Sequence, residues 1–538
     1  PATFTKPYEA DEKFLRQVDG LVQLCQAHRL VYLPCLLCGY NTVASDEELA
    51  KQAAYSEAFA KRYAKVPGIA YYVNGDLSFR WIDSPDIKRL WNEFLKQRYG
   101  TDERLREAWR LNPPEAKLGD LPVAEPRPKG WADIRACDFH EFKIRLVERW
   151  IDAQHRACRR GDPEHPTTVE YYQLPYGGID MRRSMAGLDL GNIGYFGLRG
   201  KDIADYPRIL KFNDLRVVGK GVSVGEFGVK THPAWSPEEG YPAKTYHTTR
   251  TEAEQLDLFL AIPHYTLGLG GAKMHNWCWL DADEWVFPWG LCYPCDNVEK
   301  DALCIYRNVG LLFRLFEPVY VPPSVYLLMP DTHRLGPSAP AVQAAVLKAI
   351  DALLDLHVDF APIGEAELDR LPKQAQAILY PIPFCLSDAT YEHLKRFVTN
   401  GGALYISGDF SFDPLRERTR TARLRELAGV EFEEENYPGI TSDATHEVQA
   451  TAEGEDVPSY TARPCMRFRL VGAQAAISYG GLPLAVFQRL GKGLVFFTAD
   501  APELWQSEDS EVLRDLYKFL IRWTGVQHRW DAPDDPAI

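Results

Sequence analysis

Residues 221–228 read Gly-Val-Ser-Val-Gly-Glu-Phe-Gly, and residues 69–76 read Ile-Ala-Tyr-Tyr-Val-Asn-Gly-Asp. Each stretch is a short apolar run that ends in a carboxylate beside glycine, Glu226 in the first and Asp76 in the second. Such runs predict buried strands of a parallel sheet. A carboxylate directly after a buried strand is costly to desolvate, so its position indicates a chemical purpose.

Strands and helices alternate around these two runs over the first three hundred residues. Strands are predicted at 30–37, 69–73, 167–173, 188–195, 217–225 and 272–279, and helices at 10–28, 47–65, 84–109, 137–159 and 251–262. This alternation is typical of a parallel α/β fold. A (β/α)8 TIM barrel needs eight strands, and the chain opens on a helix that leads into a strand. The first two strand-helix units are therefore expected to be absent from this chain, because its N-terminal segment is cropped, cleaved or supplied separately. The alternative is an open doubly wound sheet.

A second α/β pattern begins after Pro322-Pro323. Its short βαβ units predict a flavodoxin-like domain, interrupted by alternating short segments without a helical period. The expected domains are a barrel catalytic domain at 1–320, a flavodoxin-like domain at 321–430 plus 480–526, a small β insertion at 431–479 and a tail at 527–538.

The composition excludes several classes of protein. The chain has 538 residues, 46% of them apolar and 25% charged, as in a folded globular protein. Its net charge of −14 argues against a nucleic-acid partner. No apolar run approaches the ~18 residues of a membrane span. No secretory signal is recognisable and the 11 cysteines are sparse, which favours reduced thiols and a cytoplasmic location.

The cysteines leave one metal-binding alternative open. Cys35 and Cys38 form one CxxC pair, Cys292 and Cys295 form another, and Cys304 follows. Such pairs occur in structural zinc sites. Strand alternation would send Cys35 and Cys38 to opposite faces, so thiols of the core are the favoured interpretation, and no metal or other cofactor is expected.

The two carboxylates define the chemistry that a closed barrel would support. Asp76 and Glu226 lie at strand ends three strands apart, so they face each other across the mouth of the barrel. Glycoside cleavage needs this arrangement, in which one group protonates the leaving oxygen and the other attacks the anomeric carbon.

Several segments resemble glycoside hydrolase family 42 β-galactosidases. Residues 91–109, WNEFLKQRYGTDERLREAW, resemble the segment after the fourth strand of that family. Residues 249–262, TRTEAEQLDLFLAI, and 272–281, AKMHNWCWLD, are similar to its last helix and eighth strand. Residues 325–430 with 481–525 resemble its trimerisation domain.

The resemblance implies a retaining exo-β-glycosidase of β-galactosidase type. Glu226 occupies the place of the family's nucleophile, and Asp76 that of its acid/base residue. The family carries an Asn-Glu pair there, whereas this chain has Gly75 and Asp76, so its acid is one methylene shorter and Asn74 would have to replace the lost Asn. The resemblance further implies a homotrimer and a small glycoside or oligosaccharide substrate.

Other residues near the strand ends are expected to bind substrate, although alternation allows only about half of them to face the site. The predicted set is Asn74, Glu170, Tyr172, Tyr195, His232, Asn276, Trp277 and Trp279, with Gln173, Asn192 and His275 as further residues that could line the pocket. Tyr195 is expected to donate a hydrogen bond to Glu226, and Trp277 or Trp279 to stack on the sugar ring.

Three alternatives stay open. The chain could be an inactive carbohydrate-binding or scaffold protein on the same fold. It could act on another sugar, such as a β-glucoside, β-mannoside or fucoside, because single hydroxyl groups distinguish them. Cys385 follows a strand and could be the nucleophile of an amidotransferase, but the residues around it lack the small side chains of a tight nucleophile elbow.

Overall fold

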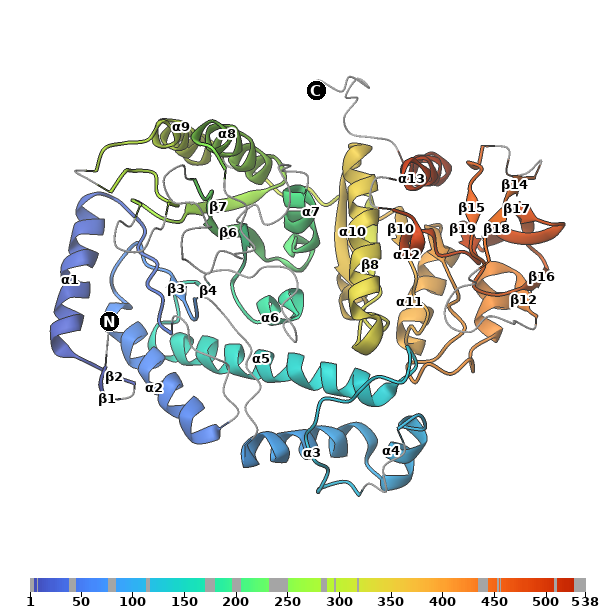
Figure 1. The fold of residues 1–538 in the computed structure, drawn as a ribbon, viewed down its shortest axis with the longest axis horizontal. Coiled ribbons are helices and arrows are strands. Elements are labelled where there is room, and N and C mark those ends of the chain that lie inside the picture. Colours follow the sequence, from blue (N-terminus) through green and yellow to red (C-terminus); the bar gives the residue numbers. More distant parts are fainter. Residues whose placement is uncertain are drawn as a thin grey trace. The chain divides into compact units, whose positions relative to one another are not determined.

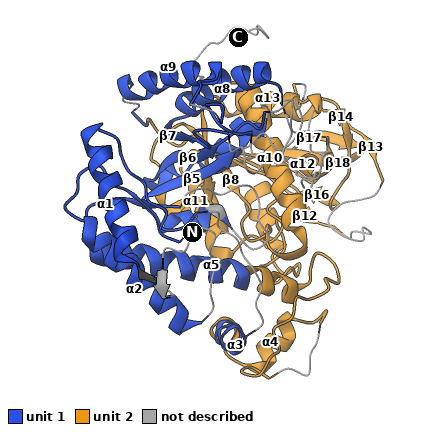
Figure 2. Cartoon of the chain, turned by 60° about the vertical axis from the view of Figure 1, so that its left-hand side comes forward, with its two compact units in different colours: residues 1–94, 142–320 blue, residues 95–141, 321–538 orange. Residues whose placement is uncertain are grey.

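The computed structural model describes residues 4–6, 8–37, 45–75, 84–112, 117–169, 180–195, 205–231, 250–281, 288–294, 297–316, 319–433, 444–451, 454, 456–507 and 510–526. The chain divides into two compact units (Figure 2). Unit 1 comprises residues 1–94 and 142–320, and unit 2 comprises residues 95–141 and 321–538.

Unit 1 alternates strands and helices, which are drawn from blue to green in Figure 1. Its elements are β1 (Phe4–Lys6), β2 (Glu9–Ala10), α1 (Glu12–Ala27), α2 (Asp46–Tyr63), β3 (Tyr71–Tyr72), β4 (Thr167–Thr168), α6 (Met181–Ala186), β5 (Leu190–Tyr195), α7 (Asp205–Phe212), η1 (Arg216–Val218), β6 (Gly221–Phe227), α8 (Glu252–Gly268), β7 (Gly271–Asn276) and α9 (Asp301–Leu315). The helices α3 (Pro85–Tyr99) and α5 (Ile134–Gly161) contribute residues to both units.

In the described residues, six parallel strand segments of unit 1 follow one another in chain order. Residues 32–36 lie beside β3 through the bridges of Tyr32 with Ile69 and Cys35 with Tyr72. β3 pairs with β4, and β5, β6 and β7 form a three-stranded parallel sheet. The backbone of Asp189, just before β5, donates to the Thr167 carbonyl of β4. The predicted succession of six barrel strands is confirmed.

Unit 2 contains one large sheet and its helices, drawn from yellow to red in Figure 1 apart from α4. Its strands are β8 (Val325–Met329), β9 (Phe360–Gly364), β10 (Ala377–Tyr380), β11 (Ala403–Ser407), β12 (Val430–Phe432), β13 (His446–Glu447), β14 (Gln449–Ala450), β15 (Thr461–Ala462), β16 (Phe468–Leu470), β17 (Gln474–Tyr479), β18 (Leu482–Leu490) and β19 (Gly493–Thr498). Its helices are α4 (Asp102–Ala108), η2 (Gly336–Ser338), α10 (Ala339–Asp355), η3 (Glu365–Arg370), α11 (Asp388–Thr399), η4 (Leu424–Ala428), α12 (Pro502–Trp505) and α13 (Glu511–Thr524).

The large sheet has the predicted flavodoxin-like order. Five parallel strands lie in the order β9-β8-β10-β11-β19, which is 2-1-3-4-5 when β8 is counted as the first. β18, β17 and β14 continue the sheet with antiparallel pairing. The chain between β11 and β19 therefore extends the sheet as well as forming the small strands of the predicted insertion.

Residues 95–141 belong to unit 2, where buried polar contacts hold the segment together and Arg416 connects it to the rest of the unit. The fully buried Asp138 carboxylate accepts hydrogen bonds from the Tyr99 hydroxyl and the Trp109 indole, both at 2.6 Å, and lies 2.9 Å from Arg98 Nε. The Arg416 guanidinium donates to the backbone carbonyls of Trp131 and Leu335.

Candidate active site

The two faces of β6 are distinguished by their contacts. Phe227 packs on Phe259 of α8 with ring centroids 4.8 Å apart, so its side chain points outward. Ser223 donates to Asn192 Oδ1 of β5 at 2.8 Å and points into the barrel. Between them, Ile193 pairs with Val224 and the next residue of β5 pairs with Glu226, so Gly225 forms a bulge.

This bulge places Glu226 on the inner face, next to the outward Phe227. The Glu226 side chain is 7% exposed. The thiol of Cys278 lies within the electrostatic reach of Glu226, and burial together with this carboxylate raises the pKa of the thiol to about 12. The site therefore holds a protonated thiol within electrostatic range of the buried Glu226 side chain.

The segment after β7 approaches the end of β6. The backbone N–H of Trp277 donates to the Phe227 carbonyl at 2.8 Å. The Trp277 ring lies 5.7 Å from the Trp289 ring, and Cys278 donates its backbone N–H to the Trp289 carbonyl. Trp277 thus lies one residue beyond β7, beside the nucleophile predicted at Glu226.

Asn74 follows β3 and is the most conspicuous polar group of that strand end. Tyr71 points outward, because its hydroxyl donates to Asp162 at 2.7 Å. Alternation therefore turns Tyr72 and Asn74 inward. Asn74 is fully buried, and among the described residues neither Oδ1 nor Nδ2 has a hydrogen-bond partner. Buried amides are nearly always hydrogen-bonded, so Asn74 indicates a place for a polar ligand or water.

Three polar side chains meet in the interior of the barrel. Lys273 Nζ of β7 donates to the Tyr72 hydroxyl at 2.7 Å, and this hydroxyl lies 3.0 Å from Nδ1 of His275. Burial, followed by the Lys273 charge, lowers the pKa of His275 to about 3. The imidazole is therefore neutral at physiological pH.

The structure describes some of the predicted site residues and leaves others outside the described ranges. Asp76, Glu170, Tyr172 and His232 lie outside the described residues. Glu226, Asn74 and Trp277 lie at the ends of the barrel strands described above. Asn276 donates from Nδ2 to the Cys278 carbonyl at 2.7 Å, and its Oδ1 is buried without a partner in the described chain. Trp279 is 56% exposed, and its indole N–H donates to Asn297.

The expected contact between Tyr195 and Glu226 is wrong. The Tyr195 hydroxyl donates to Asp205 Oδ1 at 2.7 Å, and its ring packs on Tyr206 of α7 at 4.8 Å. The physical reason is alternation along β5, because Asn192 points inward and Tyr195, three residues later, points to the helices.

Tyr72 and Lys273 were not predicted as site residues. The available signal was a lysine two residues before His275 in the strand GAKMHN, since residues at i and i+2 share a face. Its partner on β3 could not be identified without knowing which strands face each other.

The other chemistries have little support. In the described part of the chain, no three His, Cys, Asp or Glu side chains could together hold a metal ion, and Cys38 and Cys295 lie outside it. Cys385 is fully buried, which raises the pKa of its thiol to about 12. A protonated thiol is a poor nucleophile, which disfavours the amidotransferase alternative.

Among the described helices, none combines the length and apolarity that a bilayer crossing requires.

Comparisons with known proteins agree with this description. Residues 41–214 match the model of glycoside hydrolase family 42, described as beta-galactosidase. The β-galactosidase BgaP of Planococcus sp. (strain L4) is 26% identical over 204 residues, which are 35% of this chain and 28% of that protein. The chain thus aligns with 28% of the length of the curated relatives that it matches. The matched residues include Asn74 and Asp76 but end before Glu226.

Solved structures extend the likeness of the fold to nearly the whole chain. The β-galactosidase from Bacillus circulans sp. alkalophilus has a TM-score of 0.74 at 14% identity, covering 99% of this chain and 84% of that one. The polyextremophilic β-galactosidase from the Antarctic haloarchaeon Halorubrum lacusprofundi has a TM-score of 0.75 at 15% identity, covering 99% and 85%. The expected resemblance to the β-galactosidases of glycoside hydrolase family 42 is confirmed, with a TIM-barrel unit followed by a second α/β unit.

Proposed function

We propose that this chain is a retaining exo-β-glycosidase of β-galactosidase type, with Glu226 as the nucleophile and Asp76 as the acid/base residue. The observation that carries the proposal is the position of Glu226. It is a buried acidic side chain on the inner face of a barrel strand, in a chain whose fold is similar to that of β-galactosidases and whose residues 41–214 match their family model.

The proposed mechanism has two displacements. Glu226 attacks the anomeric carbon while the Asp76 carboxyl group protonates the leaving oxygen, which yields a covalent glycosyl-enzyme. Asp76, now a carboxylate, then removes a proton from water as the water attacks the same carbon and releases Glu226. The two carboxyl groups of such enzymes lie about 5 to 5.5 Å apart.

Asn74 and Trp277 support a sugar as the ligand. A sugar hydroxyl can both donate to Oδ1 and accept from Nδ2 of Asn74, which would satisfy the two amide atoms that lack partners in the described residues. The Trp277 backbone is bonded to Phe227, the residue after Glu226, and its indole is the proposed apolar face on which the sugar ring stacks.

We further propose that this chain forms a homotrimer in the cytoplasm. A solution mass near three times 61.1 kDa by light scattering would support the trimer, and a monomer mass would contradict it.

The function is tested by hydrolysis of aryl β-galactosides, β-glucosides, β-mannosides and β-fucosides. Glu226→Gln should lower kcat by about 10³-fold or more on the best substrate, because the nucleophile is lost. Asp76→Asn should be slow on unactivated leaving groups, and azide should rescue it by forming a glycosyl azide of retained configuration.

Glu299→Gln is the matched control, because this glutamate lies at the surface and pairs with Arg307. It should keep the wild-type rate. If the folded wild-type protein cleaves none of the glycosides, the catalytic proposal fails, and calorimetric titration with the free sugars then tests the carbohydrate-binding alternative.

A further inference from the structure

The imidazole of His275 lies beside the predicted nucleophile. Asn276 pairs with Phe227, so their preceding residues, His275 and Glu226, are neighbours on β7 and β6. Both point into the barrel, Glu226 opposite to the outward Phe227 and His275 opposite to Met274, which contacts Thr266 of α8. Neighbouring strands lie about 4.8 Å apart, so a sugar bound at Glu226 would be within reach of His275.

The Tyr72 hydroxyl connects this imidazole to a cation. Lys273 is a donor only, so the Tyr72 oxygen accepts its hydrogen bond. An oxygen that already accepts from an ammonium group becomes a better donor and a poorer acceptor, because hydrogen bonds in a chain polarise one another. The Tyr72 hydroxyl is therefore expected to donate its hydrogen bond to Nδ1 of His275, 3.0 Å away.

The other nitrogen of the ring has a different environment. Within the described residues, the only hydrogen bond of the imidazole is the one at Nδ1, and the ring is partly exposed. When Nδ1 of a neutral imidazole accepts a hydrogen bond, Nε2 carries the proton and is a donor. The ring thus offers one N–H group of defined position toward the inside of the barrel.

We propose that Tyr72 and Lys273 hold His275 in the neutral Nε2–H tautomer, and that Nε2–H donates to a hydroxyl group of the sugar bound at Glu226. The inference rests on the proposed function and makes His275 a specificity-determining residue of that site, with Tyr72 and Lys273 as positioning residues. A neutral N–H donor suits a neutral sugar hydroxyl, whereas a positively charged imidazolium would form an ion pair with the Glu226 carboxylate and weaken it as a nucleophile.

The tautomer is tested by nitrogen NMR of the protein labelled with ¹⁵N-histidine, the His275 signals being assigned by their loss in His275→Gln. The wild-type protein should show Nε2 protonated and Nδ1 unprotonated. Tyr72→Phe should give a mixture of both tautomers. Tyr71→Phe is the matched control, because this neighbouring tyrosine points outward to Asp162, and it should keep the wild-type signals.

The sugar contact is tested with monodeoxy aryl glycosides of the preferred sugar. His275→Phe should lower kcat/KM on the full sugar by about 10- to 100-fold, and His275→Gln by less, since its amide N–H can replace Nε2–H. On the one deoxy substrate that lacks the contacted hydroxyl, wild type and His275→Phe should be equal.

Failure of this inference is distinguishable from failure of the proposed function. A proton on Nδ1 in the wild-type protein, or the same His275→Phe loss on every deoxy substrate, overturns the inference while catalysis stands. If no glycoside is cleaved, the sugar contact is tested by NMR titration with free galactose, glucose, mannose and fucose. The inference requires that one of these sugars shifts the Nε2–H signal of His275, and it is overturned if none of them does.

Discussion

Asp138 holds residues 95–141 together within unit 2, because it contacts both ends of this segment. Its fully buried carboxylate accepts from Tyr99 and Trp109 and compensates the charge of Arg98. Asp138→Ala should lower the free energy of unfolding by about 3 to 5 kcal/mol, because it leaves a partly buried cation and two donors unpaired. Urea unfolding followed by tryptophan fluorescence measures this change.

Asp152→Ala is the control on the same helix. The Asp152 side chain is 45% exposed and pairs with Arg156 one turn later, so its loss should cost less than about 0.5 kcal/mol. Equal effects of the two substitutions would contradict the assigned role of Asp138.

Single residues also show what could be read from the sequence. Glu226 was predictable, because a carboxylate after an apolar strand has few structural explanations. The inward face of its strand depends on the bulge at Gly225, which no periodicity reveals. Tyr195 was mispredicted for the related reason that the register of a strand decides which of its residues face the site.

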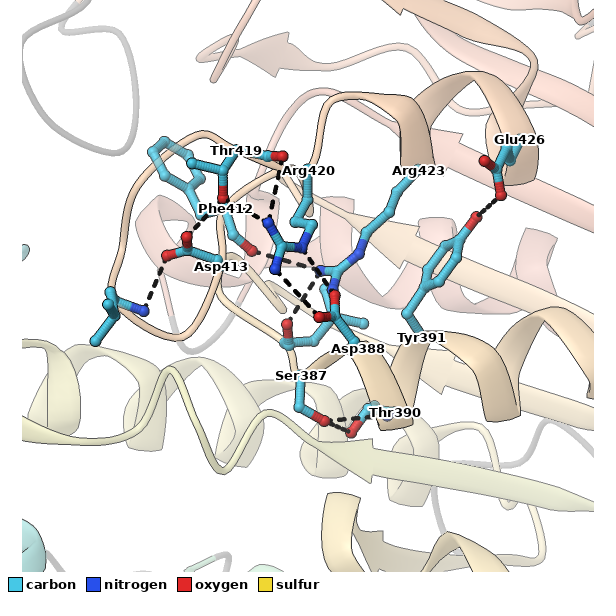
Figure 3. Close-up of polar contacts among 12 residues, drawn as sticks. Ser387, Asp388, Thr390, Tyr391, Phe412, Asp413, Thr419, Arg420, Arg423 and Glu426 are labelled. Carbon is cyan, nitrogen blue, oxygen red and sulfur yellow. Dashed lines mark hydrogen bonds and ion pairs between the residues drawn. The ribbon is translucent and has the colours of Figure 1, made fainter. Parts of the chain in front are cut away.

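At the scale of elements, α11 is tied to the chain after β11 by a cluster of ionic hydrogen bonds (Figure 3). The Asp388 carboxylate accepts from Arg420 at 2.9 and 3.1 Å and from Arg423, and these contacts lower the pKa of Asp388 to about 2. The Arg423 guanidinium also donates to the Leu386 carbonyl at 3.0 Å. The cluster connects the first turn of α11 to η4.

This cluster predicts a pH dependence of stability. The folded pKa of Asp388 is lower than the unfolded value of about 3.9, so its contribution is present above pH 4 and is lost as the pH falls toward 2. Because Asp388 is 64% exposed, solvent screening limits the contribution to about 1 kcal/mol. Asp388→Asn should lower the urea midpoint at pH 7, and the difference from wild type should shrink at pH 3.

The matched control is Asp369→Asn, whose carboxylate is 84% exposed and contacts His393. It should leave the midpoint unchanged at pH 7. Wild-type and Asp388→Asn midpoints that run parallel from pH 7 to pH 3 would exclude the linkage.

The elements themselves were largely predictable. The apolar stripe at 10–28 corresponds to α1, and the five parallel strands of unit 2 follow from short apolar runs between helices. The affiliation of residues 95–141 could not be predicted, because it depends on contacts such as Arg416 with Trp131, 285 positions apart in sequence. Local patterns carry no information on such pairs.

At the scale of the whole molecule, the two units share secondary structure. α5 contributes residues 134–141 to unit 2 and residues 142–161 to unit 1, and α3 is divided between the units at residues 94 and 95. Figure 1 shows α5 as one continuous helix. A helix is cooperative along its length, so unfolding one unit removes packing that stabilises the helix within the other.

We therefore expect one thermal transition for the whole chain, although multidomain proteins of this size often show several. Scanning calorimetry should give equal calorimetric and van't Hoff enthalpies, and Asp138→Ala, a change in unit 2, should move the entire transition to lower temperature by a few degrees. Two separate transitions, of which Asp138→Ala moves only one, would show that the shared helices do not couple the units. An insertion of two glycines after Glu141, within α5, separates the two cases. In a coupled molecule the insertion should split the single transition in two. If the units are not coupled, α3 and α5 unfold in part with each unit, and the insertion should leave both transitions in place.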